Sequence, residues 1–427
     1  MAEAALAQDM SEAELVELAK RVLPAGGFGN VSYPLIVARG EGSHVWDVSG
    51  NEYIDYLLGS GPMIVGHAHP EVLAATQHCV TLGTTFFANN ADGIHLAAEI
   101  VDAMPSVEQV RFVSSGSEAD MYAMRLARAH TGRDKILKFE GGYHGMSDFG
   151  LISLAPKRKS NFPVGVPDSP GIPKSVQQEM LVAPYNDLAM VESLVKEHKG
   201  EIAAILAEPF QRLIPPQPGF LEGLRRITDE NDILLIFDEV VTGFRFAYGG
   251  AQQYYGVMPD ICTMGKAIGG GFPLAAIGGK AEIMANFDKS AVGEDKFMAQ
   301  IGTLSGNPVA AAAGRKTLEI LKRPGAFETL FARGEALMEG YRDILKRRNI
   351  EAKVVGDAPM FDVIFTNQEV VDYRSSLGDP EKAAKYNAGM RKRGILKSES
   401  KHYIGVCHTE ADIEATIRAF DESMAEL

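Results

Sequence analysis

The sequence predicts an α/β protein with a mainly parallel sheet flanked by helices in a large domain, and a smaller α+β domain formed by the N- and C-terminal segments. Two observations support this prediction. Short apolar runs alternate with segments of helical period through the centre of the chain, and charged amphipathic helices dominate after residue 325. We expect residues 1–70 to join the small domain, 71–324 to form the large domain, and 325–427 to complete the small one.

Several runs in the centre are apolar on both faces, as expected for strands that helices cover. The predicted strands are VRFVSS (110–115), KILKFE (135–140), IAAILAE (202–208), ILLIFDEV (233–240) and DICTM (260–264). Apolar residues at helical spacing predict a helix over 117–130. The segment SHVWDVSGNEYIDYL predicts a hairpin. Residues 151–180 contain five prolines and predict a long loop, which inside an enzyme often acts as a lid.

Composition and charge exclude several classes of partner. The chain has 427 residues and a net charge of −14, and its basic cluster is confined to KRK at 157–159, so we expect no nucleic-acid partner. No apolar run approaches the roughly 18 residues of a membrane span, so we expect no membrane partner. Three widely spaced cysteines fit the cytoplasm. His67 and His69 lack a third ligand, so we expect no metal. Small molecules are the expected partners.

Three ionisable residues, Glu208, Asp238 and Lys266, stand at or just after the ends of predicted strands. Ligands of open α/β sheets bind beyond the carboxyl ends of the strands, so we expect these residues to converge. A lysine that forms an imine and a carboxylate that keeps a heterocyclic nitrogen protonated are what pyridoxal phosphate (PLP) requires. Lys266 would also be the base that moves the substrate proton.

The segment SSGSEA (114–119) lies between a predicted strand and a predicted helix, which is a favourable place for a phosphate. Gly116 would let the backbone approach the anion closely, and the hydroxyl groups of Ser115 and Ser117 would add donors. In isolation this segment is also compatible with a capping box that binds nothing.

The flat cofactor ring needs contacts on both faces. Tyr143 in GGYHG (141–145) offers an aromatic ring directly after a strand. Val240 lies two residues past Asp238, hence on the same side of that strand. We include His144 among the cofactor-binding residues, although a histidine in such a place is more often structural.

Other interpretations stay open at this level. Lys266 alone is compatible with a loop lysine, and Asp238 with a helix cap. The run GGGFPL suggests a nicotinamide oxidoreductase, but Leu274 replaces the third glycine of the dinucleotide fingerprint and Pro273 interrupts it. A protein whose PLP site has become structural or regulatory is a further alternative. The joint occurrence of these motifs at strand ends favours a catalytic PLP site.

The sequence resembles the class-III, fold type I, PLP-dependent aminotransferases, and within them it is most similar to glutamate-1-semialdehyde 2,1-aminomutase. The segments that carry the resemblance include GHAHPEV, SSGSEA, TGRDKILKFEGGYHG, IFDEVVTGFRFAYGG, MGKAIGGGFP and GTLSGNP, in this order. The resemblance implies that Lys266 forms the Schiff base and that Asp238 pairs with the pyridinium. It places Tyr143 and Val240 on the ring faces, and the phosphate at Gly116 and Ser117.

The resemblance further implies that Thr303 reaches the phosphate in the neighbouring subunit, so the active unit would be a homodimer with active sites at the interface. The N-terminal loop PAGGFGNVSYP lacks the arginine with which relatives commonly bind a carboxylate. Arg212 would lie near the substrate instead, together with Glu208. The basic residues 157–159 also differ from the aminomutase gate.

We therefore expect a transaminase that moves an amino group from an amine or amino acid to a carbonyl compound by a ping-pong mechanism. The close alternative is aminomutation of glutamate 1-semialdehyde, which uses the same residues. The sequence leaves open the donor, the acceptor, the stereochemistry and any assembly beyond the dimer.

Overall fold

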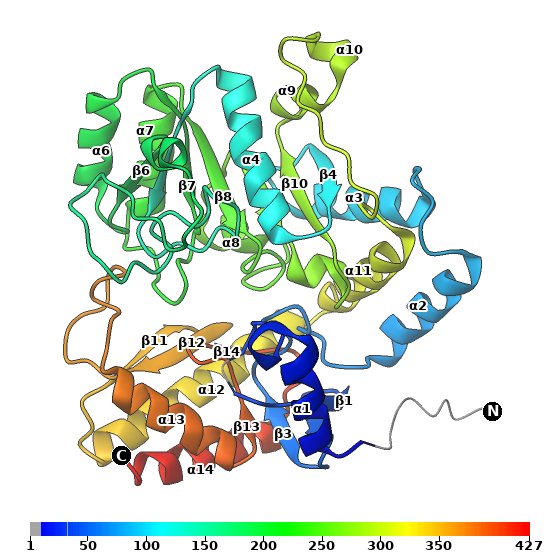
Figure 1. Ribbon diagram of the computed structural model, residues 1–427, viewed down its shortest axis with the longest axis vertical. Coiled ribbons are helices and arrows are strands. Elements are labelled where there is room, and N and C mark those ends of the chain that lie inside the picture. The colour runs from blue at the N-terminus through cyan, green and yellow to red at the C-terminus, as the bar shows by residue number, and fades with distance from the viewer. Residues whose placement is uncertain (1–9, 32) are drawn as a thin grey trace.

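A seven-stranded sheet occupies the centre of the protein in this computed structural model, which describes residues 10–31 and 33–427 (Figure 1). The strand order is β4-β10-β9-β8-β7-β5-β6. Its strands are β4 (Gln109–Val113), β5 (Lys135–Phe139), β6 (Met180–Ala183), β7 (Ile202–Ala207), β8 (Leu234–Glu239), β9 (Ile261–Met264) and β10 (Ala275–Gly279). Strand β10 is antiparallel to both neighbours, and the other pairs are parallel. The other six strands therefore end at the same edge of the sheet.

Helices cover both faces of this sheet because its central strands alternate apolar side chains between two clusters. On one face, α4 (Gly116–Thr131) packs against β7, β9 and β10. On the opposite face, α7 (Phe220–Glu230) packs against β7 and β8. Neighbouring residues of β8 illustrate the alternation, since Ile236 belongs to the α4 cluster and Leu235 to the α7 cluster. Every residue of β7 is buried, as expected for a strand covered on both sides.

Shorter elements complete this part of the protein. They are α2 (Pro70–Leu82), α3 (Ala91–Ala103), α5 (Lys174–Gln178), α6 (Leu188–Glu197), α8 (Gly250–Tyr255), α9 (Ala281–Met284), α10 (Lys289–Val292), α11 (Pro308–Leu321) and the 3₁₀ turns η2 (Lys266–Gly269) and η3 (Ala285–Phe287). Helix α11 packs on α2, α3 and η2. The glycine run after Lys266 lies at this contact, because a Cβ on Gly270 would stand 2.7 Å from the backbone of Ala313. The run thus serves close packing.

Two small sheets and three long helices form the lower part in Figure 1. One sheet contains β1 (Val37–Glu41), β2 (His44–Asp47), β3 (Glu52–Asp55) and β13 (Ile395–Leu396), and the other contains β11 (Lys353–Asp357), β12 (Met360–Ile364) and β14 (His402–Tyr403). The helices are α12 (Ala326–Arg347), α13 (Pro380–Lys392) and α14 (Glu410–Met424), and α1 (Glu12–Val22) and η1 (Pro24–Gly26) precede β1. Strand β13 pairs with β3, so N- and C-terminal segments share one sheet. The exact domain boundaries stay predictions.

Most predicted elements occur where the sequence placed them. All five predicted strands, the helix over 117–130 and the β2–β3 hairpin are present. Strands β6 and β10 of the large sheet were not predicted. Residues 151–180 are largely irregular, apart from α5, and their role as a lid stays a prediction. In the described part of the chain, no helix is long and apolar enough to cross a membrane.

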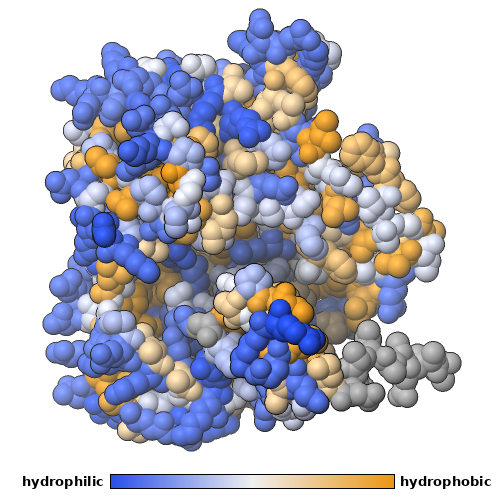
Figure 2. All heavy atoms as spheres, viewed as in Figure 1, coloured by the Kyte–Doolittle hydropathy of each residue, from blue (hydrophilic) through white to orange (hydrophobic). Residues whose placement is uncertain are grey.

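The two parts meet at the edge where the parallel strands end. Arg245 follows β8 and is 1% exposed. Its guanidinium donates to the carbonyl oxygen of Ile404 at 2.8 Å and to that of Gly61. Burial lowers the pKa of Arg245 to about 10, so this arginine stays charged at neutral pH. The molecular surface is hollowed between the two parts (Figure 2).

Candidate functional site

Lys266 lies two residues after the end of β9 and begins the turn η2. Its backbone has a φ of 50°, a left-handed conformation that is uncommon for a residue with a side chain. Burial lowers the pKa of its amine; Tyr403 and Asp238 act in the opposite direction, and the charge of Lys401 lowers the pKa further. A lowered pKa increases the fraction of neutral amine, which is the form that acts as a nucleophile and a base.

Asp238 near the end of β8 forms a buried pair with His144. The Nδ1 atom of His144 lies 2.8 Å from Oδ2 of Asp238, and the two side chains are 0% and 4% exposed. The backbone N–H of Val240 donates to Oδ1 of Asp238 at 3.1 Å. A carboxylate can only accept, so His144 donates from Nδ1. Among the described residues, Nε2 of His144 has no hydrogen-bond partner.

Two further carboxyl groups surround this pair. Asp120 on α4, which the sequence analysis missed, accepts a hydrogen bond from Oγ1 of Thr263 at 2.7 Å. Burial, followed by the charge of Asp238, raises the pKa of Asp120 well above its usual range. Glu208 follows β7 and accepts from the backbone N–H of Tyr143 at 3.1 Å. Burial and the charge of Asp238 raise the pKa of Glu208 as well.

The group formed by Asp120, His144 and Asp238 also has the composition of a metal site, because its potential ligand atoms lie within 4.8 Å of one another. These atoms already take part in hydrogen bonds, from His144 to Asp238 and from Thr263 to Asp120. The direct bond between His144 and Asp238 favours a pyridinium-binding carboxylate over a metal ligand set. The absence of a metal stays a prediction.

The start of α4 forms a capping box. Oγ of Ser115 lies 3.2 Å from the backbone nitrogen of Glu118, and the Glu118 carboxylate accepts from the backbone nitrogens of Ser114 and Ser115 at 2.8 Å. The Ser115 hydroxyl is thus engaged in the cap. The N–H groups of Gly116 and Ser117, at the first two helical positions, have no acceptor within the helix and suit an anion.

Close packing against Val240 explains why residue 116 is a glycine. A Cβ at this position would lie 2.9 Å from Cγ1 of Val240, the residue that follows β8. The hydroxyl oxygen of Ser117 accepts from the backbone N–H of Met146 at 3.1 Å. The start of α4, the end of β8 and the loop after β5 are therefore joined at one point.

Lys138, a second residue that the sequence analysis missed, fixes the loop that carries Tyr143. Its ammonium donates to the carbonyl oxygens of Gly142, Gly150 and Ile152 at 3.2, 3.1 and 2.8 Å. The residue is fully buried, and burial lowers its pKa to about 7. The signal in the sequence was a lysine between the apolar residues Leu137 and Phe139 of a buried strand.

A cavity of about 570 Å³ lies beside these groups, between the two parts of the protein. Arg212 lines it and donates from Nε to the carbonyl oxygen of Gly141 at 3.0 Å. The guanidinium carbon of Arg212 lies 5.4 Å from the centre of the Tyr143 ring, which is 37% exposed. Much of the remaining wall is apolar and includes Leu213, Ile214, Val363, Ile364, Phe365 and Leu377.

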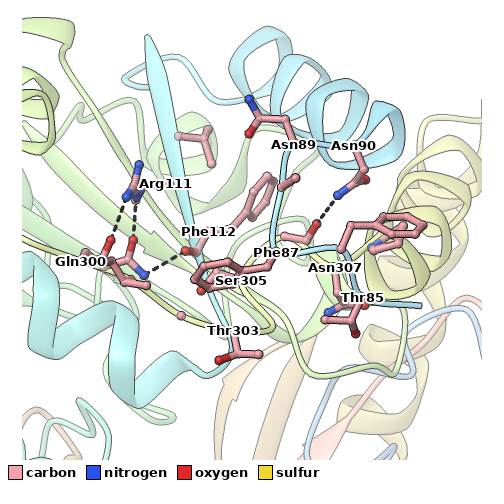
Figure 3. A pocket seen from close by; sticks show the side chains of 17 residues that line it. Thr85, Phe87, Asn89, Asn90, Arg111, Phe112, Gln300, Thr303, Ser305 and Asn307 are labelled. Atoms are coloured by element: carbon pink, nitrogen blue, oxygen red, sulfur yellow. Dashed lines mark hydrogen bonds between the residues drawn. The ribbon is translucent and has the colours of Figure 1, made fainter. Parts of the chain in front are cut away.

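Thr303 lies apart from this cluster. It is exposed and lines a different cavity of about 330 Å³, formed by the segment 85–90, strand β4 and residues 300–308 (Figure 3). In this cavity Arg111 donates to the side chain and the backbone of Gln300 at 2.6 and 2.8 Å. Within the described residues, no hydrogen bond or ion pair joins the Thr303 side chain to Lys266, Asp238 or His144 of its own chain.

The residues at the sheet edge fit PLP. A buried lysine of lowered pKa suits the aldehyde, and a buried carboxylate oriented by His144 suits a protonated ring nitrogen. Free N–H groups at the start of α4 suit the phosphate. The unpartnered Nε2 of His144 shows that this buried cluster has polar capacity beyond its internal hydrogen bonds.

Comparisons with known proteins agree with this geometry. The sequence model of the family described as aminotransferase class-III matches residues 28–403. The chain is similar to an omega-transaminase from Sphaerobacter thermophilus, with 36% identity, a TM-score of 0.92 and coverage of 98% of each chain. It is also similar to a β-phenylalanine aminotransferase from Variovorax paradoxus, with 30% identity, a TM-score of 0.87, and coverage of 97% of this chain and 94% of that one.

A glutamate-1-semialdehyde aminomutase from Pseudomonas aeruginosa PAO1 shares 24% identity and a TM-score of 0.87, with coverage of 97% and 94%, which supports the fold alone. The predicted resemblance in fold and family is thus confirmed. The chain belongs to the class-III aminotransferases, a PLP-dependent family of the fold type I architecture.

Proposed function

We propose that this chain binds PLP at Lys266 and transfers an amino group from an amine or amino acid to a carbonyl acceptor in a ping-pong cycle. The observation that carries the proposal is the position of Lys266 and of the His144–Asp238 pair at the ends of neighbouring strands β9 and β8. When bound, PLP supplies an aldehyde that captures amines and a ring that accepts electrons.

The residues of the chain divide the work in this proposal. Asp238 accepts a hydrogen bond from the protonated ring nitrogen, and the Nδ1–H group of His144 keeps the carboxylate oriented. Tyr143 and Val240 contact the two faces of the ring. The Nζ atom of Lys266, as a neutral amine, would take the proton from the amine-bearing carbon of the substrate and deliver it to the former aldehyde carbon of the cofactor in the first half of the cycle, and it would move a proton in the reverse direction in the second half.

The phosphate is bound by the backbone N–H groups of Gly116 and Ser117 and by the Ser117 hydroxyl. Ser115 contributes through the cap that fixes the start of α4, because its hydroxyl is engaged with Glu118. Glu208 and Arg212 lie on the substrate side. The two more similar structures are named as an omega-transaminase and a β-phenylalanine aminotransferase, which favours amine donors with an apolar group.

The test combines cofactor attachment with turnover. The purified protein incubated with PLP should show the absorption band of a cofactor bound to a lysine as an imine. Reduction with borohydride should then attach the cofactor permanently to the peptide that contains Lys266, which mass spectrometry would identify. An amine donor and a keto acid should then exchange the amino group, and Lys266→Ala should do neither. Formation of 5-aminolevulinate from glutamate 1-semialdehyde without an added acceptor would favour the aminomutase instead. Attachment without turnover would favour a silent PLP protein.

A homodimer completes the proposed site, with Thr303 reaching the phosphate in the partner subunit. The support is an exposed apolar surface over α2 and the segment toward α3, visible on the right of Figure 2. It includes Leu82, Phe86 and Phe87, which are 68%, 53% and 70% exposed. Monomeric proteins rarely expose such a patch. Sedimentation should show a dimer, and Phe87→Glu should weaken it together with PLP retention. A cytoplasmic location stays a prediction.

A further inference from the structure

Two buried lysines lie four residues apart near β14, and their environments differ. Lys397 is 5% exposed, and its ammonium contacts Oδ1 of Asn387 at 2.7 Å, the Ser398 carbonyl oxygen at 2.7 Å and Oδ2 of Asp362 at 2.8 Å. Lys401 is 7% exposed. Within residues 10–31 and 33–427, its ammonium has neither a hydrogen-bond nor an ion-pair partner. Lys401 lines a cavity, so its charge, which no hydrogen bond or ion pair of the described chain engages, is available to an anion that enters that cavity.

The position of Lys401 identifies where that anion lies. Lys401 lines the cavity of about 570 Å³ that also contains Arg212. Its charge lowers the pKa of Glu208 and of Lys266, as secondary influences after burial, so Lys401 is near the reacting amine. It also lies 5.9 Å from the centre of the Tyr403 ring. Lys401 therefore lines the cavity and also lies close enough to Lys266 and Glu208 to influence their charges.

Arg212 is a poorer candidate for the same task. Its Nε atom is committed to the carbonyl oxygen of Gly141 at 3.0 Å, and its guanidinium lies beside the Tyr143 ring. The cavity also has apolar lining residues, among them Val363, Phe365 and Leu377. The Lys401 ammonium in a cavity with apolar lining suits a molecule with one carboxylate and one apolar group.

We propose that Lys401 binds the carboxylate of an amino acid substrate whose apolar side chain fills this cavity. The inference rests on the proposed transaminase function and adds its substrate class. Lys401 acts as a specificity-determining residue: it distinguishes an amino acid from an amine of the same shape that lacks the carboxylate. It leaves the proton transfer to Lys266.

The experiment compares two donors that differ in one group. These donors are 3-amino-3-phenylpropanoate and 1-phenylpropan-1-amine, in which a methyl group replaces the carboxylate. For the PLP-loaded enzyme, Lys401→Met should lower kcat/KM for the acid about 10- to 100-fold, the range for loss of a hydrogen bond to a charged group. The value of kcat/KM for the amine should change by no more than about twofold in Lys401→Met. Lys401→Arg should retain most of the activity with the acid.

A binding measurement gives a second readout that does not depend on turnover. Calorimetry with the unreactive 3-phenylpropanoate should show weaker binding to Lys401→Met, and to Lys401→Gln if the first variant folds poorly. Lys385→Met makes the same change at an exposed position of α13, the helix that lines the cavity at its start, and should alter neither readout.

The outcomes separate the two proposals. The role of Lys401 would be overturned if Lys401→Met left unchanged both the ratio of kcat/KM for the acid to kcat/KM for the amine and the binding of 3-phenylpropanoate. Transamination itself would stay intact in that case. The same holds if Arg212→Ala removes acid selectivity while Lys401→Met keeps it, or if the wild-type enzyme turns over the amine and does not bind 3-phenylpropanoate. A wild-type protein that fails to attach PLP at Lys266 would instead overturn the proposed function.

Discussion

The segment between β12 and α13, orange in Figure 1, is fastened to the large sheet by one ion pair whose loss should be measurable. Arg374 donates from Nε and Nη2 to the two carboxylate oxygens of Glu140 at 2.6 and 2.9 Å. It also donates to the carbonyl oxygen of Ser160 at 2.8 Å. The Glu140 side chain is 3% exposed and that of Arg374 is 30% exposed.

The cost of Arg374→Met follows from this geometry. Removing one partner of a buried ion pair costs about 3 to 5 kcal/mol because the remaining charge is left unpaired. The partial exposure of Arg374 lets water reach the carboxylate, so we expect the lower end, about 3 kcal/mol. The double variant Glu140→Gln/Arg374→Met removes both charges and should recover about 1 to 2 kcal/mol of that loss.

Denaturant unfolding of the three proteins measures these differences. Arg226→Met, which breaks two exposed pairs, with Glu192 at 2.5 Å and with Glu230 at 3.0 Å, serves as the control and should change the midpoint little. Tyr373 and Ser376 belong to the released segment and line the cavity, so Arg374→Met should raise KM more than it lowers kcat. A loss below about 1 kcal/mol, or a double variant no more stable than the single one, would refute the reasoning.

Three further predictions concern the site. Burial lowers the pKa of Lys138 to about 7 in the folded protein, whereas it is near 10.5 in the unfolded chain. Between these values the unfolded chain binds more protons, so stability rises with pH. Denaturant unfolding should show that the free energy of unfolding rises by about 2 kcal/mol from pH 7 to 9, and Lys138→Met should lack this rise. Gly116→Ala should weaken PLP retention through contact with Val240, and adding Val240→Ala should restore part of it; titration with PLP measures both. Asp238→Asn should lower kcat at least about 100-fold in steady-state assays while Lys266 still attaches PLP.

The sheet was predictable where side chains carried a strong pattern. Strands such as β7 and β8 are continuous apolar runs, and their length and composition were sufficient. Strand β10 reads AAIGG, and alanine and glycine have a low propensity for strands. In the structure a Cβ on Gly278 would lie 2.8 Å from Val107, so tertiary packing selects glycine inside the strand. Such a contact between distant segments leaves no local signal.

The site was predictable to the extent that its chemistry is carried by residues at strand ends. The prediction that Glu208, Asp238 and Lys266 stand at or just after strand ends agrees with the structure, in which the three strands β7, β8 and β9 are neighbours. The supporting residues were not found. Asp120 lies in the middle of an amphipathic helix and Lys138 inside a strand, and both interact with groups far away in the sequence or across a loop.

The adjacent acids Asp238 and Glu239 show why position on a strand decides function. Successive side chains of β8 point to opposite faces, so the two carboxylates enter different surroundings. Glu239 accepts from Oγ1 of Thr242 at 2.9 Å, from the backbone of Ala251 at 2.5 Å, and from the side chain of Gln252 at 3.0 Å. The carboxylate of Glu239 is therefore occupied by hydrogen bonds that fix the position of α8.

Asp238, in contrast, accepts from His144 at 2.8 Å and from one backbone N–H at 3.1 Å, with a weak contact from Thr263 at 3.5 Å, among the contacts of the described residues. A buried carboxylate with acceptor capacity remaining can bind another cationic donor, whereas one already saturated cannot. The same residue type at two successive positions therefore supplies a structural cap on one face of the strand and a cofactor partner on the other. Exchanging the roles would require a one-residue shift of β8, which would also move its apolar side chains to the wrong faces.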